Sequence, residues 1–242
     1  MLGHFFVEKM MQGLEKMIAG AHGKVALLDA APGRYGLRAV LAGMYLAIVV
    51  MVFWSLVQDL GGSPFGKVLA SAFFGVGLCI IVFTQTELFT SNVMYMAMSS
   101  FAHSTRWRDA FRLWTACYLG NMLGAIVIAL LLWGAGIIDA LPTNHALYLG
   151  AAHKVHQAAG VIFFKGVLAN WIVCLATLIA LRVDTDLARL ASMVLVVFIF
   201  LYLGFEHSIA NMTTFAIALL GNGSSSAGDA LFISYSARRE IS

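Results

Sequence analysis

Five apolar stretches, each long enough to cross a lipid bilayer, constrain most strongly how this 242-residue chain can fold. A membrane-spanning helix needs about 20 mostly apolar residues. The stretches cover residues 39–57, 68–98, 113–137, 158–181 and 190–220, and polar residues interrupt the second and the fifth. Only 11% of the residues are charged and 61% are hydrophobic, whereas about a quarter of a soluble domain is charged. The sequence therefore predicts an all-α integral membrane protein.

Lysine and arginine are distributed unequally between the connections of these stretches. Lys67 and Lys154 lie near the two connections on one side of the membrane. The other side carries ten of the fifteen basic residues: Lys9, Lys16, Lys24, Arg34, Arg38, Arg106, Arg108, Arg112, Arg182 and Arg189. Because cytoplasmic connections hold the excess of positive charge, we expect a cytoplasmic N-terminus. Residues 5–28 have the pattern of an amphipathic helix at the membrane surface.

The interruptions of the second and fifth stretches share a pattern in which a glutamate is followed five residues later by an asparagine. Glu87 precedes Asn92 in this way, and Glu206 precedes Asn211. Paired interruptions in the two halves of a chain indicate a transport site near the bilayer midplane, although packing between helices is the simpler alternative. We interpret these four residues as structural, with each carboxylate accepting hydrogen bonds from backbone N–H groups that the break frees.

Three side chains in the interruptions can donate hydrogen bonds to an anion. His207 is the only histidine within an apolar stretch, and its imidazole is neutral or charged near physiological pH. Thr90 and Ser91 add hydroxyl donors for an ion that sheds water. The alternatives are a buried structural histidine and hydroxyls that bond back to a helix carbonyl. We expect all three residues to line the path of a small monovalent anion.

Four blocks of sequence resemble the formate/nitrite transporter family. They are TELFTSN (86–92), YLGNMLGA (118–125), FFKGVLANWIVCLA (163–176) and GFEHSIANM (204–212). The FFKG start of the fourth stretch and the ANMT-x-FA sequence at 210–216 are most similar to the nitrite branch. The resemblance implies an aquaporin-like inverted repeat in the bacterial inner membrane, assembled as a homopentamer with a pore in each protomer. It implies nitrite as substrate, with formate or hydrosulfide as alternatives.

The resemblance also implies roles for individual residues. Thr90 matches the family's mobile-loop threonine and His207 its central pore histidine, with Asn170 beside it and Lys154 as a vestibule lysine that attracts anions. His207 would compensate the charge of the dehydrated anion by hydrogen bonding or lend it a proton, so proton coupling stays open. The residues that match the apolar constrictions are Phe74, Leu78, Phe89, Val173 and Phe200.

The chain departs from the family where a sixth span should follow residue 220. The sequence at 221–242 is too polar to cross a membrane, so we expect the sixth span to be missing. We divide the chain into an N-terminal amphipathic and cytoplasmic segment (1–36), a channel domain (37–220) and a polar tail (221–242). A truncated member that does not conduct is therefore one alternative function. A neutral-solute channel is another, although the sequence lacks the paired Asn-Pro-Ala motifs of aquaporins.

Other function classes find little support in the sequence. Cys79, Cys117 and Cys174 lie within apolar runs and show neither metal-ligand spacing nor a disulfide framework. A net charge of +3 follows from the membrane-flanking basic residues and does not indicate nucleic-acid binding. Neither a nucleophile–base pair nor a phosphate-binding loop is recognisable, so we expect no enzyme activity, metal or cofactor.

Overall fold

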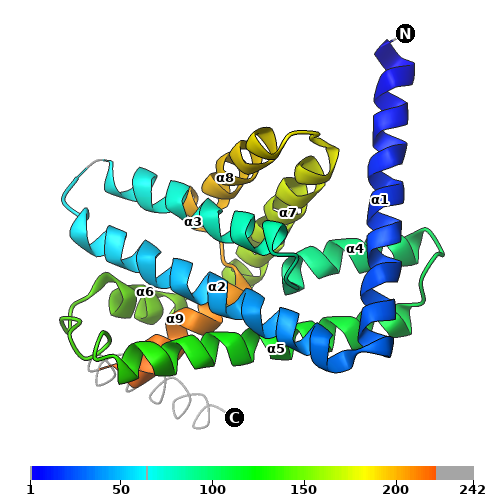
Figure 1. Ribbon diagram of the computed structural model, residues 1–242. Helices are drawn as coiled ribbons and strands as arrows, with labels where there is room; N and C mark the ends of the chain where they lie inside the picture. Colours follow the sequence, from blue (N-terminus) through cyan, green and yellow to red (C-terminus); the bar gives the residue numbers. More distant parts are fainter. Residues whose placement is uncertain (1, 64, 222–242) are drawn as a thin grey trace.

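The computed structural model describes residues 2–63 and 65–221. In this part of the chain all regular structure is helical (Figure 1). The helices are α1 (Leu2–Ala30), α2 (Pro32–Asp59), α3 (Gly66–Phe83), α4 (Phe89–Phe101), α5 (Trp107–Gly134), α6 (Ala146–Val155), α7 (Ala159–Arg182), α8 (Asp186–Tyr202) and α9 (Ser208–Leu220). The polar tail expected at residues 222–242 lies outside the described residues.

Four of the helices, α2, α3, α5 and α7, are long and apolar enough to cross a membrane, and α9 is a shorter apolar helix. The expected all-α membrane class is confirmed, and the five apolar stretches correspond to α2, α3 with α4, α5, α7, and α8 with α9. The ten-residue helix α6 was not predicted, because its segment is short and contains His153 and Lys154. The expected domain boundary at residue 36 lies within α2, and the division into segments stays a prediction.

Both predicted interruptions are present, and they have the same backbone geometry. The first break separates α3 from α4 between Thr84 and Leu88, and the second separates α8 from α9 between Leu203 and His207. Each contains one residue with positive φ, Gln85 at 54° and Gly204 at 71°. This left-handed conformation ends a helix and is easily adopted by glycine. Residue 204 lies 119 positions after residue 85, as Glu206 does after Glu87, so the two breaks are equivalent in the repeat.

The helices before the breaks also repeat. Residues 38–43 of α2 read RAVLAG, and residues 165–170 of α7 read KGVLAN. In the first half, α5 covers this face of α2 at close range. A Cβ added to Gly43 would collide with the backbone of Asn121, and one on Gly124 with the carbonyl of Val40. Small residues let membrane helices approach closely, so these glycines hold α5 against α2.

The centre of the molecule is an apolar cluster built from α2, α3, α7, α8 and α9. α3 packs against α8, where Gly75 leaves room for the backbone of Val194. α1 runs across the bundle beside α4 and extends away from it (Figure 1). It is helical as expected, and its location at the membrane surface stays a prediction. This arrangement places α1 beside the first break and α6 beside the second.

Candidate functional site

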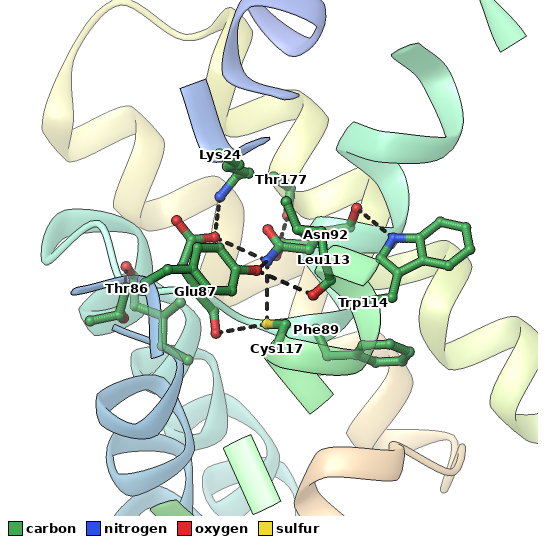
Figure 2. Close-up of polar contacts among 12 residues, drawn as sticks. Lys24, Thr86, Glu87, Phe89, Asn92, Leu113, Trp114, Cys117 and Thr177 are labelled. Carbon is green, nitrogen blue, oxygen red and sulfur yellow. Dashed lines mark hydrogen bonds and ion pairs between the residues drawn. The ribbon is translucent and has the colours of Figure 1, made fainter. Parts of the chain in front are cut away.

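The first break is organised around the carboxylate of Glu87, which is 3% exposed (Figure 2). Lys24 of α1 places Nζ 2.5 Å from Oε2 of this residue. Asn92, one turn into α4, donates from Nδ2 to the same oxygen at 3.0 Å. A buried carboxylate is stable only when its charge is paired and its lone pairs are bonded. The Glu-x-x-x-x-Asn pattern and a lysine from another helix together meet this condition.

Asn121 of α5 forms hydrogen bonds with the backbone of the first break. Its Oδ1 accepts a hydrogen bond from the N–H of Phe89 at 2.9 Å. Its Nδ2 donates to the carbonyls of Glu87 at 2.9 Å and Ala39 at 2.7 Å. Phe89 is the first residue of α4, so its N–H has no acceptor within the helix. One fully buried side chain thus satisfies three backbone groups and ties α2, α4 and α5 together.

The second break repeats the carboxylate arrangement with partners from the other half. Lys154 of α6 places Nζ 2.5 Å from Oε2 of Glu206, and Asn211 donates to this oxygen at 2.8 Å. Gln157 donates to Oε1 at 3.0 Å. Lys154 therefore holds a position equivalent to that of Lys24. α6 supplies the lysine that pairs with the glutamate of the second break, as α1 does for the first.

The donors to both carboxylates differ from those that we expected. Lysine and amide side chains occupy Glu87 and Glu206, whereas we assigned these carboxylates the freed backbone N–H groups. The physical reason is charge: an ammonium compensates a full negative charge, and a backbone N–H carries only a partial one. Lys154 is also more constrained than a free vestibule lysine, since its side chain is 18% exposed and its charge is balanced by Glu206.

His207 lies directly at the second break, with 5% of its surface exposed. Its Nδ1 accepts a hydrogen bond from the N–H of Ala210 at 3.2 Å and so caps α9. Its Nε2 lies 3.4 Å from Oγ1 of Thr90, and its ring stacks on Phe200 at 5.8 Å. An imidazole nitrogen that accepts from an N–H carries no proton, so the proton of the neutral ring is on Nε2. The fold thus directs an N–H donor at Thr90 from the first half.

Three of the predicted pore residues converge on one cavity of about 340 Å³ between α4, α7 and the second break. Thr90, Asn170 and His207 all line it, as do Gly166 and Ser208. Gly166 and Asn170 are the repeat equivalents of Ala39 and Gly43, the residues of α2 that α5 covers. Outside the backbone of α7 itself, the Glu206 carbonyl at 3.9 Å is the only heavy atom of the described residues within 4 Å of a Cβ added to Gly166. We call this cavity the α7 groove; among the described helices, none covers it as α5 covers α2.

Further cavities lie on the two sides of the central cluster. The α6-side cavity, about 380 Å³, is lined by Lys67, Lys154 and Trp54 among others. It shares residues with a much smaller cavity of about 40 Å³, which we call the neck. Lys154 and Trp54 line the neck as well, and His207 lies at it. The α6-side cavity and the neck together lead from the α6 side to the imidazole of His207.

On the opposite side, the α1-side cavity has a volume of about 580 Å³ and a basic lining that includes Lys16, Lys24 and Arg38. Ser91 lines this cavity and lies 3.4 Å from the hydroxyl of Thr177, whose own proton goes to the Val173 carbonyl. Ser91 is therefore on the α1 side of the molecule, whereas Thr90 beside it faces His207 and the α7 groove.

The residues predicted as constrictions belong to the central cluster that separates the two sides. Phe74, Leu78, Val173 and Phe200 are each at most 5% exposed and pack together there. Phe74 and Phe200 also line the neck, with their rings 5.9 Å apart. Phe89 is partly buried against the cluster; it packs edge-on with Tyr118 at 5.1 Å and lines the α7 groove.

Several residues of the site were missed by the sequence analysis. Lys24 was counted only as a cytoplasmic charge, and Asn121 only as part of the YLGN block. The sequence held no specific signal for these partners, because Lys67 lies nearer to Glu87 than Lys24 does and Lys165 lies nearer to Glu206 than Lys154 does. Trp54 and Gln157 carry no such signal either, because their roles depend on contacts with distant helices.

Comparison with known proteins agrees with this architecture. The family model described as "Formate/nitrite transporter" matches residues 11–236. The chain is 36% identical to the "Uncharacterized transporter YwcJ" of Bacillus subtilis over 86% of this chain and 82% of the relative. It is 32% identical to the "Nitrite transporter NirC" of Escherichia coli, over 80% of this chain and 71% of the relative. A solved structure named "FNT family ion channel" superposes with a TM-score of 0.84 at 29% identity, covering 90% of this chain and 86% of that one.

These findings define the class of the protein: a multi-pass membrane protein with two half-helices that meet near the centre. The chain belongs to the formate/nitrite transporter family, as its four sequence blocks predicted. A second solved structure, "Pentameric formate channel with formate bound", superposes with a TM-score of 0.69 at 26% identity over 79% of this chain and 76% of that one.

Proposed function

We propose that this chain conducts a small monovalent anion, with nitrite as its principal substrate, across the bacterial inner membrane. The observation that carries the proposal is the placement of His207. Its imidazole lies where the two broken spans meet, lines both the neck and the α7 groove, and places Nε2 beside the hydroxyl of Thr90. NirC is named a nitrite transporter, and a further relative of E. coli, 33% identical, is named a formate channel.

The hydrogen bonds of His207 favour donation by the neutral ring over a fixed imidazolium. Nδ1 is used by the N–H of Ala210, and this leaves Nε2–H as the group that can face the anion. An anion entering the apolar cluster loses water, and each charge-assisted hydrogen bond offsets part of that cost. Thr90 and Asn170, which line the same cavity, would add two further donors. The proton-lending route stays open as an alternative.

The charges of the two cavities support entry of an anion from either side. The α1-side cavity is lined by Lys16, Lys24 and Arg38, and the α6-side cavity by Lys67 and Lys154. Since Lys24 and Lys154 are paired with glutamates, Lys16, Arg38 and Lys67 would contribute most of the attraction. We place the α1 side in the cytoplasm, where the excess of basic residues puts it, and we propose a homopentamer with one pore in each protomer.

Flux of nitrite and formate into liposomes tests the proposal. His207→Phe keeps a flat ring but removes the donor, and we expect nitrite flux to fall about tenfold to a hundredfold, because a hydrogen bond to a charged group contributes about 1.5–3 kcal/mol. The matched control is His153→Phe on the exposed face of α6. Equal nitrite flux in the wild type and His207→Phe would contradict the proposed role of the imidazole.

A non-conducting member of the family is a second candidate, and the α7 groove favours it. Gly166 and Ser208 line a cavity on the face of α7 that corresponds to the covered face of α2. If no more of the protein covered this groove than its described helices do, lipid would reach the pore beside His207. Flux through the chain alone, compared with the chain fused to a further membrane-spanning helix that carries an asparagine, separates the two candidates. Flux only in the fused form would identify the chain alone as non-conducting.

A further inference from the structure

The neck is more than tenfold smaller than the α1-side cavity. The neck holds about 40 Å³ and the α1-side cavity about 580 Å³, although the repeat relates the two sides. Discrimination between anions of different size therefore depends on the groups that hold the neck in shape. The neck lies between α2, α6, α8 and α9, and Trp54 of α2 is the side chain that lines both it and the α6-side cavity while hydrogen-bonding to α9.

A directed chain of hydrogen bonds joins Trp54 to His207. The indole Nε1–H, which can only donate, bonds to Oγ1 of Thr214 at 3.1 Å. The hydroxyl proton of Thr214 is then available for the carbonyl of Ala210 at 3.2 Å. The N–H of Ala210 bonds to Nδ1 of His207 at 3.2 Å. Every donor and acceptor in this series is assigned by chemistry. The N–H of Ala210 keeps the proton of His207 on Nε2, and the indole acts on His207 only by holding the first turn of α9 in place.

A second contact connects Trp54 to the ion pair at the same break. A Cβ on Gly150 of α6 would collide with the Trp54 ring, so the absence of a side chain there lets α6 lie against the indole. The same helix carries Lys154, which pairs with Glu206, and Glu206 accepts from Asn211 of α9. Contacts thus join α2 to α9, α2 to α6 and α6 to α9, and these three helices line the neck. We call this set of contacts the circuit.

The first half has no equivalent of this circuit. The repeat offset of α2 and α7 places Leu181 at the position of Trp54, and the offset of the breaks places Tyr95 at the position of Thr214. A leucine side chain has no donor, so the bond from Trp54 to Thr214, which lies at the neck, has no counterpart in the first half. The difference in polar contacts coincides with the difference in cavity volume.

We propose that Trp54 is a positioning residue that sets the selectivity of the neck, with Thr214 as its partner. This inference rests on the proposed transport function. By fixing the first turn of α9 against α2 and α6, the bond keeps His207 and the neck at one spacing, which admits a small anion and excludes a larger one. Trp54 acts through Thr214 and Ala210, and it need not touch the anion.

The test compares uptake of formate with uptake of acetate, which adds one methyl group, in liposomes that contain equal amounts of protein. Trp54→Phe keeps an aromatic ring and removes the N–H. We expect the formate-to-acetate ratio to fall about fivefold, equivalent to about 1 kcal/mol, the contribution of one neutral hydrogen bond. Thr214→Val should have the same effect, Thr214→Ser should retain the wild-type ratio, and the double variant should be no worse than either single variant.

Trp133→Phe is the matched control, because this indole is 48% exposed on α5. An unchanged ratio in Trp54→Phe, or additive losses in the double variant, would overturn the proposal.

Hydrogen–deuterium exchange provides a readout that does not need transport. We expect Trp54→Phe and Thr214→Val to raise exchange in a peptide that covers residues 207–214, and Trp133→Phe to leave it unchanged. If the wild type conducts neither nitrite nor formate, the proposed function fails, and the exchange result alone decides whether Trp54 positions α9. Unchanged exchange in both variants would overturn the positioning role.

Discussion

The two breaks have the same backbone geometry and the same glutamate–asparagine–lysine arrangement, but their surroundings differ. At the first break, α5 covers α2 and supplies Asn121, which bonds to three backbone groups. At the second break, the corresponding face of α7 lines a groove of about 340 Å³, and Ser208 at the start of α9 lies in its wall. The glutamate–asparagine–lysine arrangement is therefore present at both breaks. The hydrogen bonds to the backbone of a break, in contrast, depend on a further helix that packs against it.

This difference shows that the polar residues of a break and the helix that covers the break are separate features. The carboxylate, the asparagine five residues later and a lysine from a peripheral helix occur in both halves. The asparagine clamp, by which we mean Asn121 of α5 with its hydrogen bonds to three backbone groups, occurs in the described part of the first half. We therefore expect the first break to tolerate substitution least, and the following predictions test that expectation from the largest effect to the smallest.

Asn121→Leu should have the largest effect. It preserves approximate volume, leaves the N–H of Phe89 without an acceptor, and removes one of the donors to the carbonyls of Glu87 and Ala39. Each unsatisfied buried group costs about 1–3 kcal/mol, so we expect loss of the folded protein in detergent, measured by size-exclusion chromatography. Asn144→Leu, at an exposed position, is the control. Normal folding of Asn121→Leu would show that the clamp is not what distinguishes the two halves.

Lys24→Met and Lys154→Met should each destabilise the fold by about 2–3 kcal/mol. This lies below the range for a fully buried pair, because each lysine is 18% exposed. The loss should be similar in the two variants, since the pairs are equivalent in the repeat, and adding Glu87→Gln or Glu206→Gln should restore part of it. Chemical unfolding in detergent measures the effect, with Lys16→Met as the control. Unequal losses would break the equivalence of the two carboxylate sites.

Gly43→Ala and Gly166→Ala compare the covered and the open face directly. A methyl group on Gly43 meets the Asn121 backbone, and overpacking costs about 1–3 kcal/mol. A methyl group on Gly166 meets nothing closer than 3.9 Å, so we expect no loss and a small gain in helix propensity. The midpoint of thermal unfolding measures both. A destabilised Gly166→Ala variant would mean that another helix occupies the α7 groove in the assembled protein.

Trp114→Phe should have the smallest effect. It removes the hydrogen bond from Nε1 to the carbonyl of Asn92, 3.1 Å away at the first break. A single neutral hydrogen bond contributes about 1 kcal/mol, so a shift of a few degrees in the unfolding midpoint is expected. Trp171→Phe, whose ring is 64% exposed on α7, should cause no shift. A loss as large as that of Asn121→Leu would contradict the ranking of the contacts at this break.

Much of the candidate site was predictable because its signals are local in the sequence. Hydropathy identified the spans and polar interruptions identified both breaks, whereas the capping of α9 by His207 was not predicted. The Glu-x-x-x-x-Asn spacing indicated that all four residues are structural, but the hydrogen bond from each asparagine to its glutamate was not predicted. The donors to Glu87 were predicted wrongly, since its ion-pair partner is 63 residues away in sequence.

The sequence by itself determined that this chain is a membrane protein with two interrupted spans and an imidazole at one interruption. Hydrophobic length and residue type are properties of short segments, so no tertiary contact was needed to read them. Only the tertiary structure decided that lysines from α1 and α6 balance the buried carboxylates, that Asn121 closes one break, and that Trp54 connects to His207 through α9. Those pairings depend on which helices meet, and many packings are compatible with the same apolar stretches.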